Sequence, residues 1–323
     1  LSDEARKVLL AEAPQAEAVL SHPFTPGKLA MAAEDWGMSK EEAKGFTARA
    51  VCAADSEANA EFGEGYWSDH WTYNLDLIES YLSVFPEEKE ALLFEDRRYR
   101  YYETRVRINP RAKRYEMTKN GLRQYHALAP EERRTVRKWM CTADGQEAKS
   151  TLIEKLILLC TLKTATLDPA GMGVEMEGGK PGWYDALNGL PGLLGSSMAE
   201  SCELARLLRF TIEALETHEG QVDLYEEAAA LLSEVDQILS SQQESYARWD
   251  RLNTVKEAYR ANTEIGYQGK RTAVGRKALS AMLSRLEGAV QEGIEAACGF
   301  GGGVIPTYFP FTASAVQSTP EGP

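Results

Sequence analysis

The sequence has few of the residues that build metal sites, disulfide frameworks and membrane spans. Its four histidines form no HxxxH or HExxH pattern, which argues against a zinc hydrolase. Its five cysteines are scattered and include no CxxC pair, so neither a disulfide framework nor a zinc ribbon is expected. The longest apolar run, Leu156–Leu162, is too short to span a bilayer. We therefore expect no metal, no organic cofactor and no membrane partner.

Basic charge is also in short supply, since the formal net charge is −13. Nucleic-acid backbones favour a basic surface, so a nucleic-acid partner is not expected. The acidity fits a neutral, sugar-like substrate. Reduced thiols suit the cytoplasm, and no signal peptide is visible. The chain starts at Leu1 without a methionine, and we expect it to be a fragment of a longer multidomain protein.

Most of the sequence has the periodicity and the caps of helices. Ser39 and Glu42 form a capping box, and Phe85-Pro86 ends a helix that carries one apolar stripe. The expected helices cover 2–20, 39–62, 68–84, 130–140, 146–166, 197–218, 222–243, 254–261 and 273–297. The fold class predicted is mainly α, and residues 1–323 are expected to form a single helical region.

Two segments interrupt the helices. Residues 94–117 alternate apolar and charged side chains around Asn109-Pro110, which predicts a β-hairpin insertion. Residues 168–197 hold eight glycines and three prolines, and a loop of this length within a compact domain is usually functional. Long successive helices with such a loop at one end suggest an α/α toroid, in which the loops of one mouth carry the chemistry.

The first candidate site lies in this loop. Asp185 is preceded by Trp183 and Tyr184 and followed by Asn188, with Glu177 upstream. Aromatic rings stack on the apolar faces of sugars, while carboxylates and amides bind the hydroxyl groups. An aromatic wall also desolvates a carboxyl group and raises its pKa toward neutrality, which makes it a usable acid. The alternative is a structural Trp–Tyr pair, with Asp185 as the N-cap of a short helix.

The second candidate site precedes the helix expected at 68–84. Trp67, Asp69, His70 and Trp71 bring aromatic rings, a carboxylate and an imidazole to its first turn. An aspartate is favoured there in any case by the helix dipole, so a capped helix with a core-facing Trp71 is the alternative.

These two segments carry a resemblance. Residues 182–189, Gly-Trp-Tyr-Asp-Ala-Leu-Asn-Gly, resemble the Gly-Asp-Trp-Asn-Asp-Gly-Leu/Met-Asn signature of cellobiose phosphorylase and related inverting glycoside phosphorylases. Residues 67–71 are similar to that family's Ser-Asp-Asp-His-Leu-Trp segment, and Ala199-Glu200-Ser201 loosely matches its Gly-Glu-Ser motif. Residues 62–209 look most like the long 1,2-β-oligoglucan phosphorylases. The signature differs at Gly182, Tyr184 and Ala186, so it leaves the acceptor sugar open.

The resemblance implies an (α/α)6 toroid, present here in part, with its active site at one mouth. It implies that Asp185 is the general acid and that Asp69 binds the sugar whose bond is cleaved. Inorganic phosphate would then be the co-substrate. It would attack the anomeric carbon of a β-linked gluco-oligosaccharide with inversion and release a sugar 1-phosphate. A hydrolase would need a second carboxylate to activate water, whereas phosphate is already a nucleophile.

Other functions stay open at this point. Glu175 or Glu177 could assist a hydrolase or transglycosylase on the same barrel, and a non-catalytic carbohydrate-binding fragment is a third reading. For phosphate, the glycines 301–303 and Thr307 form a chemically plausible anion-binding nest. No recognisable pattern indicates the glycosidic linkage or the substrate chain length that is preferred. Nor does one indicate the oligomeric state, or whether the fragment folds or works alone.

Overall fold

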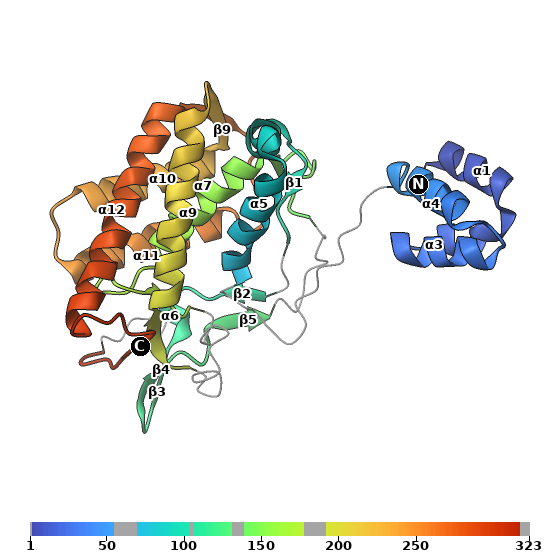
Figure 1. Ribbon diagram of the computed structural model, residues 1–323. Helices are drawn as coiled ribbons and strands as arrows, with labels where there is room; N and C mark the ends of the chain where they lie inside the picture. Colours follow the sequence, from blue (N-terminus) through green and yellow to red (C-terminus); the bar gives the residue numbers. More distant parts are fainter. Residues whose placement is uncertain (1, 55–69, 104–105, 131–138, 178–191, 317–323) are drawn as a thin grey trace. The chain divides into compact units, whose positions relative to one another are not determined.

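The computed structural model describes residues 2–54, 70–103, 106–130, 139–177 and 192–316. The chain divides into two compact units, Leu1–Glu64 and Gly65–Pro323. As predicted, the protein is mainly helical, with small two- and three-stranded antiparallel sheets; the described residues form no closed barrel (Figure 1). Among these residues no helix combines the length and apolar character that a bilayer crossing requires.

Unit 1 is a small helical unit. The Ser2 hydroxyl accepts a hydrogen bond from the Ala5 amide and caps the first helix, as the sequence predicts. The prediction of one continuous helix over 2–20 is wrong. Pro14 has no amide hydrogen to donate, and the first helix ends before it, with Ala13 as its C-cap. The helices are α1 (Asp3–Glu12), α2 (Glu17–Leu20), α3 (Pro26–Asp35) and α4 (Lys40–Cys52).

The core of unit 1 is built from α3 and α4. Leu29 and Phe46 are fully buried, and Trp36 packs edge-on against Phe46 with 6.3 Å between ring centroids. The predicted capping box of Ser39 and Glu42 is confirmed at the start of α4. The unit therefore has its own apolar core.

Unit 2 contains the longer helices. The predictions at 197–218 and at Phe85-Pro86 are confirmed closely, because the polar cap and the proline fix these boundaries locally. The predicted helix at 254–261 is longer in the structure. The helices are α5 (Tyr73–Val84), α6 (Arg111–Arg114), α7 (Leu152–Thr164), α9 (Met198–Thr217), α10 (Glu226–Ser240), α11 (Ser245–Asn262) and α12 (Arg276–Phe300).

The predicted helices at 222–243 and 273–297 begin with strands, and the one predicted at 146–166 starts only at Leu152, after a two-residue strand at Lys149–Ser150. β9 (Gln221–Tyr225) and β10 (Arg271–Gly275) pair antiparallel along their full lengths, then continue into α10 and α12. Alternating burial along β9 fits a strand with one face covered. Neither β9 nor β10 was predicted, because each is directly followed by residues with a strong helical pattern.

The segment at 94–117 contains strands, but they do not form the predicted hairpin. β1 (Tyr99–Arg100) pairs with β6 (Lys149–Ser150), and β2 (Val106–Ile108) pairs with β5 (Leu128–Pro130). A short hairpin forms further along, between β3 (Glu116–Thr118) and β4 (Gly121–Arg123). Gly121 has φ +90°, a backbone conformation that favours glycine and fits the turn there, whereas Pro110 precedes the short helix α6.

The helices of unit 2 alternate in direction around one large core. α9 packs along α12, and the start of each lies near the end of the other: the Met198 amide donates to the Thr307 carbonyl, and the Arg276 amide to the Gly220 carbonyl. α7 and α10 pack against the same core. The helical body thus has a ribbon end, marked by β9 and β10, and a stem end, marked by the sheet of β7 (Val174–Glu175), β8 (Leu194–Ser197) and β11 (Tyr308–Phe311).

Candidate functional site

The stem end holds both sides of the glycine-rich segment that carries Asp185. β7 pairs antiparallel with β8, with Val174 opposite Ser197 and Glu175 opposite Ser196, and β11 covers the other edge of β8. The Met176 amide continues the ladder by donating to the Gly195 carbonyl at 2.9 Å. The chain therefore enters the glycine-rich segment after residue 177 and returns from it at residue 193, and these two positions lie side by side. We call the paired chain on either side of the segment the stem.

Gln124, which follows β4, ties the two sides of the stem together. Its side-chain Nε2 donates to the Met176 carbonyl at 2.7 Å and to the Leu193 carbonyl at 2.6 Å. Its backbone amide donates to the Gly192 carbonyl at 2.8 Å. Gln124 is 4% exposed, so these bonds are shielded from water. The glycine-rich segment therefore has fixed ends.

Asp168 fixes the turn between α7 and β7. Its carboxylate accepts hydrogen bonds from the Ala170, Met172 and Gly173 amides and from the Ser196 hydroxyl, at 2.7 to 3.0 Å. A buried carboxylate with four donors needs no cation to be satisfied. The role of Asp168 is therefore to shape the turn and to link it to β8.

Glu177 lies at the centre of a buried ion cluster on the stem. Arg260 binds its carboxylate through two hydrogen bonds, at 3.0 and 2.8 Å, and Lys256 Nζ lies 2.7 Å from Oε1. Arg114 adds a third cation at 3.7 Å. Burial alone would raise the pKa of Glu177, but Arg260 and Lys256 outweigh it and hold the pKa well below its ordinary value. Glu177 therefore stays ionised across the physiological pH range.

Lys256 is fully buried at this cluster. Its ammonium group also donates to the Thr166 hydroxyl at 3.2 Å. Burial lowers the pKa of Lys256 to about 8, against the opposing effect of Glu177. The cluster thus joins α11 to the turn that leads into β7.

Glu175 has a different environment, although it is only two residues from Glu177. Its Oε1 accepts a hydrogen bond from the Trp249 indole N–H at 2.9 Å, and no ion pair with Glu175 is present in the described part of the chain. Burial raises the pKa of Glu175 to about 7; Lys256 acts against this shift and the charge of Glu177 adds to it. A carboxyl group of this kind can gain or lose a proton near neutral pH.

A second polar cluster lies at the first turn of α9. The Trp71 indole N–H donates to Glu200 Oε2 at 2.9 Å, and Lys163 Nζ lies 3.1 Å from the same oxygen. The ammonium group of Lys163 also lies over the Trp71 ring, 5.1 Å from a ring centroid. Trp71 and Glu200 come from two of the segments quoted for the family resemblance, 129 residues apart in sequence.

Several predicted site residues lie outside the described residues, namely Asp185, Trp183, Tyr184, Asn188, Asp69 and Trp67. Of the others, Glu177 and Trp71 occupy the two clusters above. His70 begins a 3₁₀ turn before α5, is exposed, and lies 6.1 Å from the Tyr73 ring.

The segment expected as a phosphate nest closes a helix. Thr307 is exposed, and its carbonyl accepts from the Met198 amide. The amides of glycines 301, 302 and 303 donate to carbonyls of the last turn of α12, at 2.9 to 3.2 Å. These amides are therefore committed to the C-terminal cap of α12 and are not free to bind an anion.

Sequence reasoning missed Lys256, Arg260, Arg114, Trp249, Gln124 and Lys163. The i, i+4 spacing of Lys256 and Arg260 was the available signal, because it places two cations on one face of a helix. The usual interpretation of such a pair is a solvated helix face, and only the folded chain shows that Lys256 is buried.

A scan against protein-family models gave no match for this chain, and a search of curated proteins gave none either. The resemblance to inverting glycoside phosphorylases therefore rests on the residues quoted for it. Within the described ranges, no group of three or more His, Cys, Asp or Glu side chains could hold a metal ion.

Proposed function

We propose that this chain is the central helical part of a glycoside phosphorylase that cleaves a β-linked gluco-oligosaccharide with inorganic phosphate. Asp185 would protonate the glycosidic oxygen while phosphate attacks the anomeric carbon from the opposite face. The products are a sugar 1-phosphate of inverted configuration and a shortened oligosaccharide. Asp69, together with the aromatic rings of Trp67 and Trp183, would bind the sugar.

The observation that carries this proposal is the meeting of Trp71 and Glu200 at the stem end. These residues belong to two of the three segments that resemble the phosphorylase family. The third segment, which contains Asp185, leaves from the same end through β7 and β8. Substrate-binding groups on one segment and a proton donor on another need a common location of this kind.

The stem supports the proposal in a second way. A general acid has to be held within a few tenths of an ångström of a productive position. The ladder between β7 and β8, the bonds of Gln124 and the ion cluster of Glu177 together fix both ends of the segment that contains Asp185.

The finer fold belongs to the same proposal. We propose that α7, α9, α10, α11 and α12, which alternate in direction along the chain, are part of an (α/α)6 toroid. In such a toroid, the loops at one mouth carry the active site. The stem end would be that mouth.

Replacement of Asp185 by Asn tests the proposal. Phosphorolysis of β-linked gluco-oligosaccharides should fall by about 10²–10⁴-fold, because the general acid is lost, while substrate affinity changes little. Sugar 1-phosphate release measures the rate and calorimetry measures the affinity. Asp144→Asn, at an exposed turn, is the matched control and should leave both unchanged.

Three outcomes would contradict the proposal. Equal product release with and without phosphate would identify a hydrolase or transglycosylase on the same scaffold. Oligosaccharide binding with no turnover in either variant would identify a carbohydrate-binding protein. A loss of only a few-fold in Asp185→Asn would assign the proton to another acid.

A further inference from the structure

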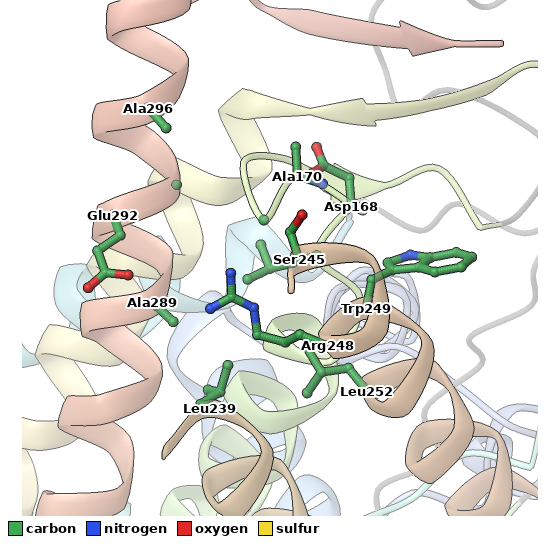
Figure 2. A pocket seen from close by; sticks show the side chains of 13 residues that line it. Asp168, Ala170, Leu239, Ser245, Arg248, Trp249, Leu252, Ala289, Glu292 and Ala296 are labelled. Atoms are coloured by element: carbon green, nitrogen blue, oxygen red, sulfur yellow. Dashed lines mark hydrogen bonds between the residues drawn. The ribbon is translucent and has the colours of Figure 1, made fainter. Parts of the chain in front are cut away.

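A cavity of about 210 Å³ lies between the end of α10, the start of α11, the last third of α12 and the turn after α7 (Figure 2). Gly293 of α12 makes this arrangement possible, because a Cβ there would collide with the Gly171 carbonyl oxygen. Much of its wall is apolar, from Leu167, Leu239, Leu252, Ala289 and Ala296.

Arg248 places a positive charge in this apolar space. Figure 2 shows its side chain extending from α11 into the region between α12 and the turn that carries Ala170. A Cβ built on Gly171 would lie 4.0 Å from Arg248 Nη2, so the guanidinium group reaches the turn. For the part of the chain that the structure describes, Arg248 forms no ion pair, even with Glu292 on the same cavity. The arginines of the stem, in contrast, pair with carboxylates.

The N-terminus of α11 adds a second positive feature. This 18-residue helix begins at Ser245, which lines the cavity, and its N-cap residue Glu244 makes no side-chain hydrogen bond to the first turn. The amides of the first turn lack intrahelical partners and carry the positive end of the helix dipole. The guanidinium group of Arg248 and the N-terminus of α11 together favour the binding of an anion.

The size and the walls of the cavity narrow the choice of anion. The volume corresponds to about seven water molecules of about 30 Å³ each, which is room for about seven non-hydrogen atoms. A multiply charged ion such as phosphate would lose its hydration against apolar walls, with one arginine to compensate and the carboxylates of Asp168 and Glu292 on the same cavity. A monocarboxylate gains both from the hydrophobic wall and from the guanidinium pair.

We propose that this cavity binds a small organic monocarboxylate, with a hydrocarbon body of about four carbons, whose carboxylate pairs with Arg248. This proposal does not depend on the sugar site proposed above. Trp249 lines the cavity and donates its indole N–H to Glu175, so an occupant touches a residue of the stem. Tryptophan fluorescence should therefore report binding.

Titration of the whole chain with valerate and isovalerate tests the proposal, by calorimetry and by tryptophan fluorescence. We expect dissociation constants at or below about 1 mM, with acetate weaker because it leaves the apolar wall uncovered. Valeramide, which is neutral and nearly isosteric, should bind at least about tenfold more weakly. Inorganic phosphate should not compete with valerate.

Two variants assign the binding to this cavity. Arg248→Gln should weaken valerate binding by about ten- to a hundredfold, whereas Arg251→Gln, at an exposed position of the same helix, should not. Ala289→Phe should abolish binding by filling the space while it keeps Arg248, and circular dichroism would verify the fold. The proposal is overturned if valeramide binds as well as valerate, if the two arginine variants behave alike, or if Ala289→Phe binds normally. Displacement of valerate by phosphate, or no binding of any carboxylate, would overturn it equally.

Discussion

The two ends of the helical body both bury carboxylates, but they neutralise them differently. At the ribbon end, Glu154 pairs with Arg271 and Arg97, whose side chains stay 23% and 49% exposed. At the stem end, Glu177 pairs with Lys256 and Arg114, whose side chains are 0% and 2% exposed. Arg260, the third cation of the stem end, is 30% exposed and resembles the arginines of the ribbon end, which can return to water. Lys256 and Arg114 cannot, and cations buried to this degree are found at the stem end.

The backbone of each end explains this difference. The ribbon end has two five-residue strands in full register and a stacked pair of rings, Tyr225 and Tyr267, 4.3 Å apart. The stem end has β7, a strand of only two residues, to hold the start of a glycine-rich segment. At the stem end, buried ion pairs thus hold the chain in place, a role that longer strands and aromatic packing have at the ribbon end. These ion pairs also favour one arrangement of the chain at the base of the glycine-rich segment.

Removal of Glu177 should have the largest effect on stability. Glu177→Ala leaves Lys256, Arg114 and Arg260 without their shared partner, and breaking a buried ion cluster in this way costs about 3–5 kcal/mol. Urea denaturation followed by tryptophan fluorescence measures the change in the free energy of unfolding. Glu219→Ala, an exposed position, is the control. A loss below about 1 kcal/mol would show that the cluster is dispensable.

Removal of Glu154 should cost less, about 1–3 kcal/mol. Glu154 and Thr151 form the capping box of α7, which contributes about 1 kcal/mol, and the partly exposed arginines can be hydrated once the carboxylate is gone. Thr151→Ala separates the cap from the ion pairs in the same denaturation experiment. Equal losses in Glu154→Ala and Glu177→Ala would contradict the proposed difference between the ends.

Glu175 should make the free energy of unfolding depend on pH. Its pKa is raised from 4.5 to about 7 in the folded chain, so the folded state holds a proton that the unfolded state has already lost. This group therefore favours folding below about pH 4.5, loses that contribution as pH rises toward 7, and opposes folding above it. Glu175→Gln should accordingly raise the free energy of unfolding by about 1–2 kcal/mol at pH 8 and change it little at pH 4.5.

Thermal unfolding at a series of pH values measures this effect. The ionised state of Glu177 is common to both proteins, so the difference between their curves reports Glu175 together with its effect on the pKa of Lys256. A variant less stable than the wild type at pH 8 would show that Glu175 is ionised and paired in the folded chain.

Local chemistry explains which parts of the fold the sequence could predict. Ser39 with Glu42, Ser197, and Phe85-Pro86 set helix boundaries through neighbouring residues, and all of them hold in the structure. β9 and β10 pair residues about 50 positions apart, and β7 has two residues, so neither generates a local pattern. Long-range pairing decided these segments.

In the candidate site, too, the features that depend on adjacent residues were predictable and those that depend on long-range contacts were not. The aromatic and carboxylate motif around Asp185 is visible in the sequence because its residues are adjacent. Glu177 was predicted to bind substrate, but the sequence could not indicate that Lys256 and Arg260 hold its carboxylate, since their burial depends on how α11 packs. Trp71 with Glu200 was suggested only through the resemblance of their separate segments, and their contact is a property of the folded chain.

Gln124 has a consequence for how the glycine-rich segment can vary. Because one side chain holds both of its ends, the entropy lost on closing the segment is governed by its length alone and rises slowly, by about 0.6 kcal/mol for each doubling. We infer that insertions or exchanges between residues 178 and 191 leave the helical body nearly as stable as before. The segment that carries the proposed acid can therefore vary in sequence at small thermodynamic cost, as long as the glutamine stays in place.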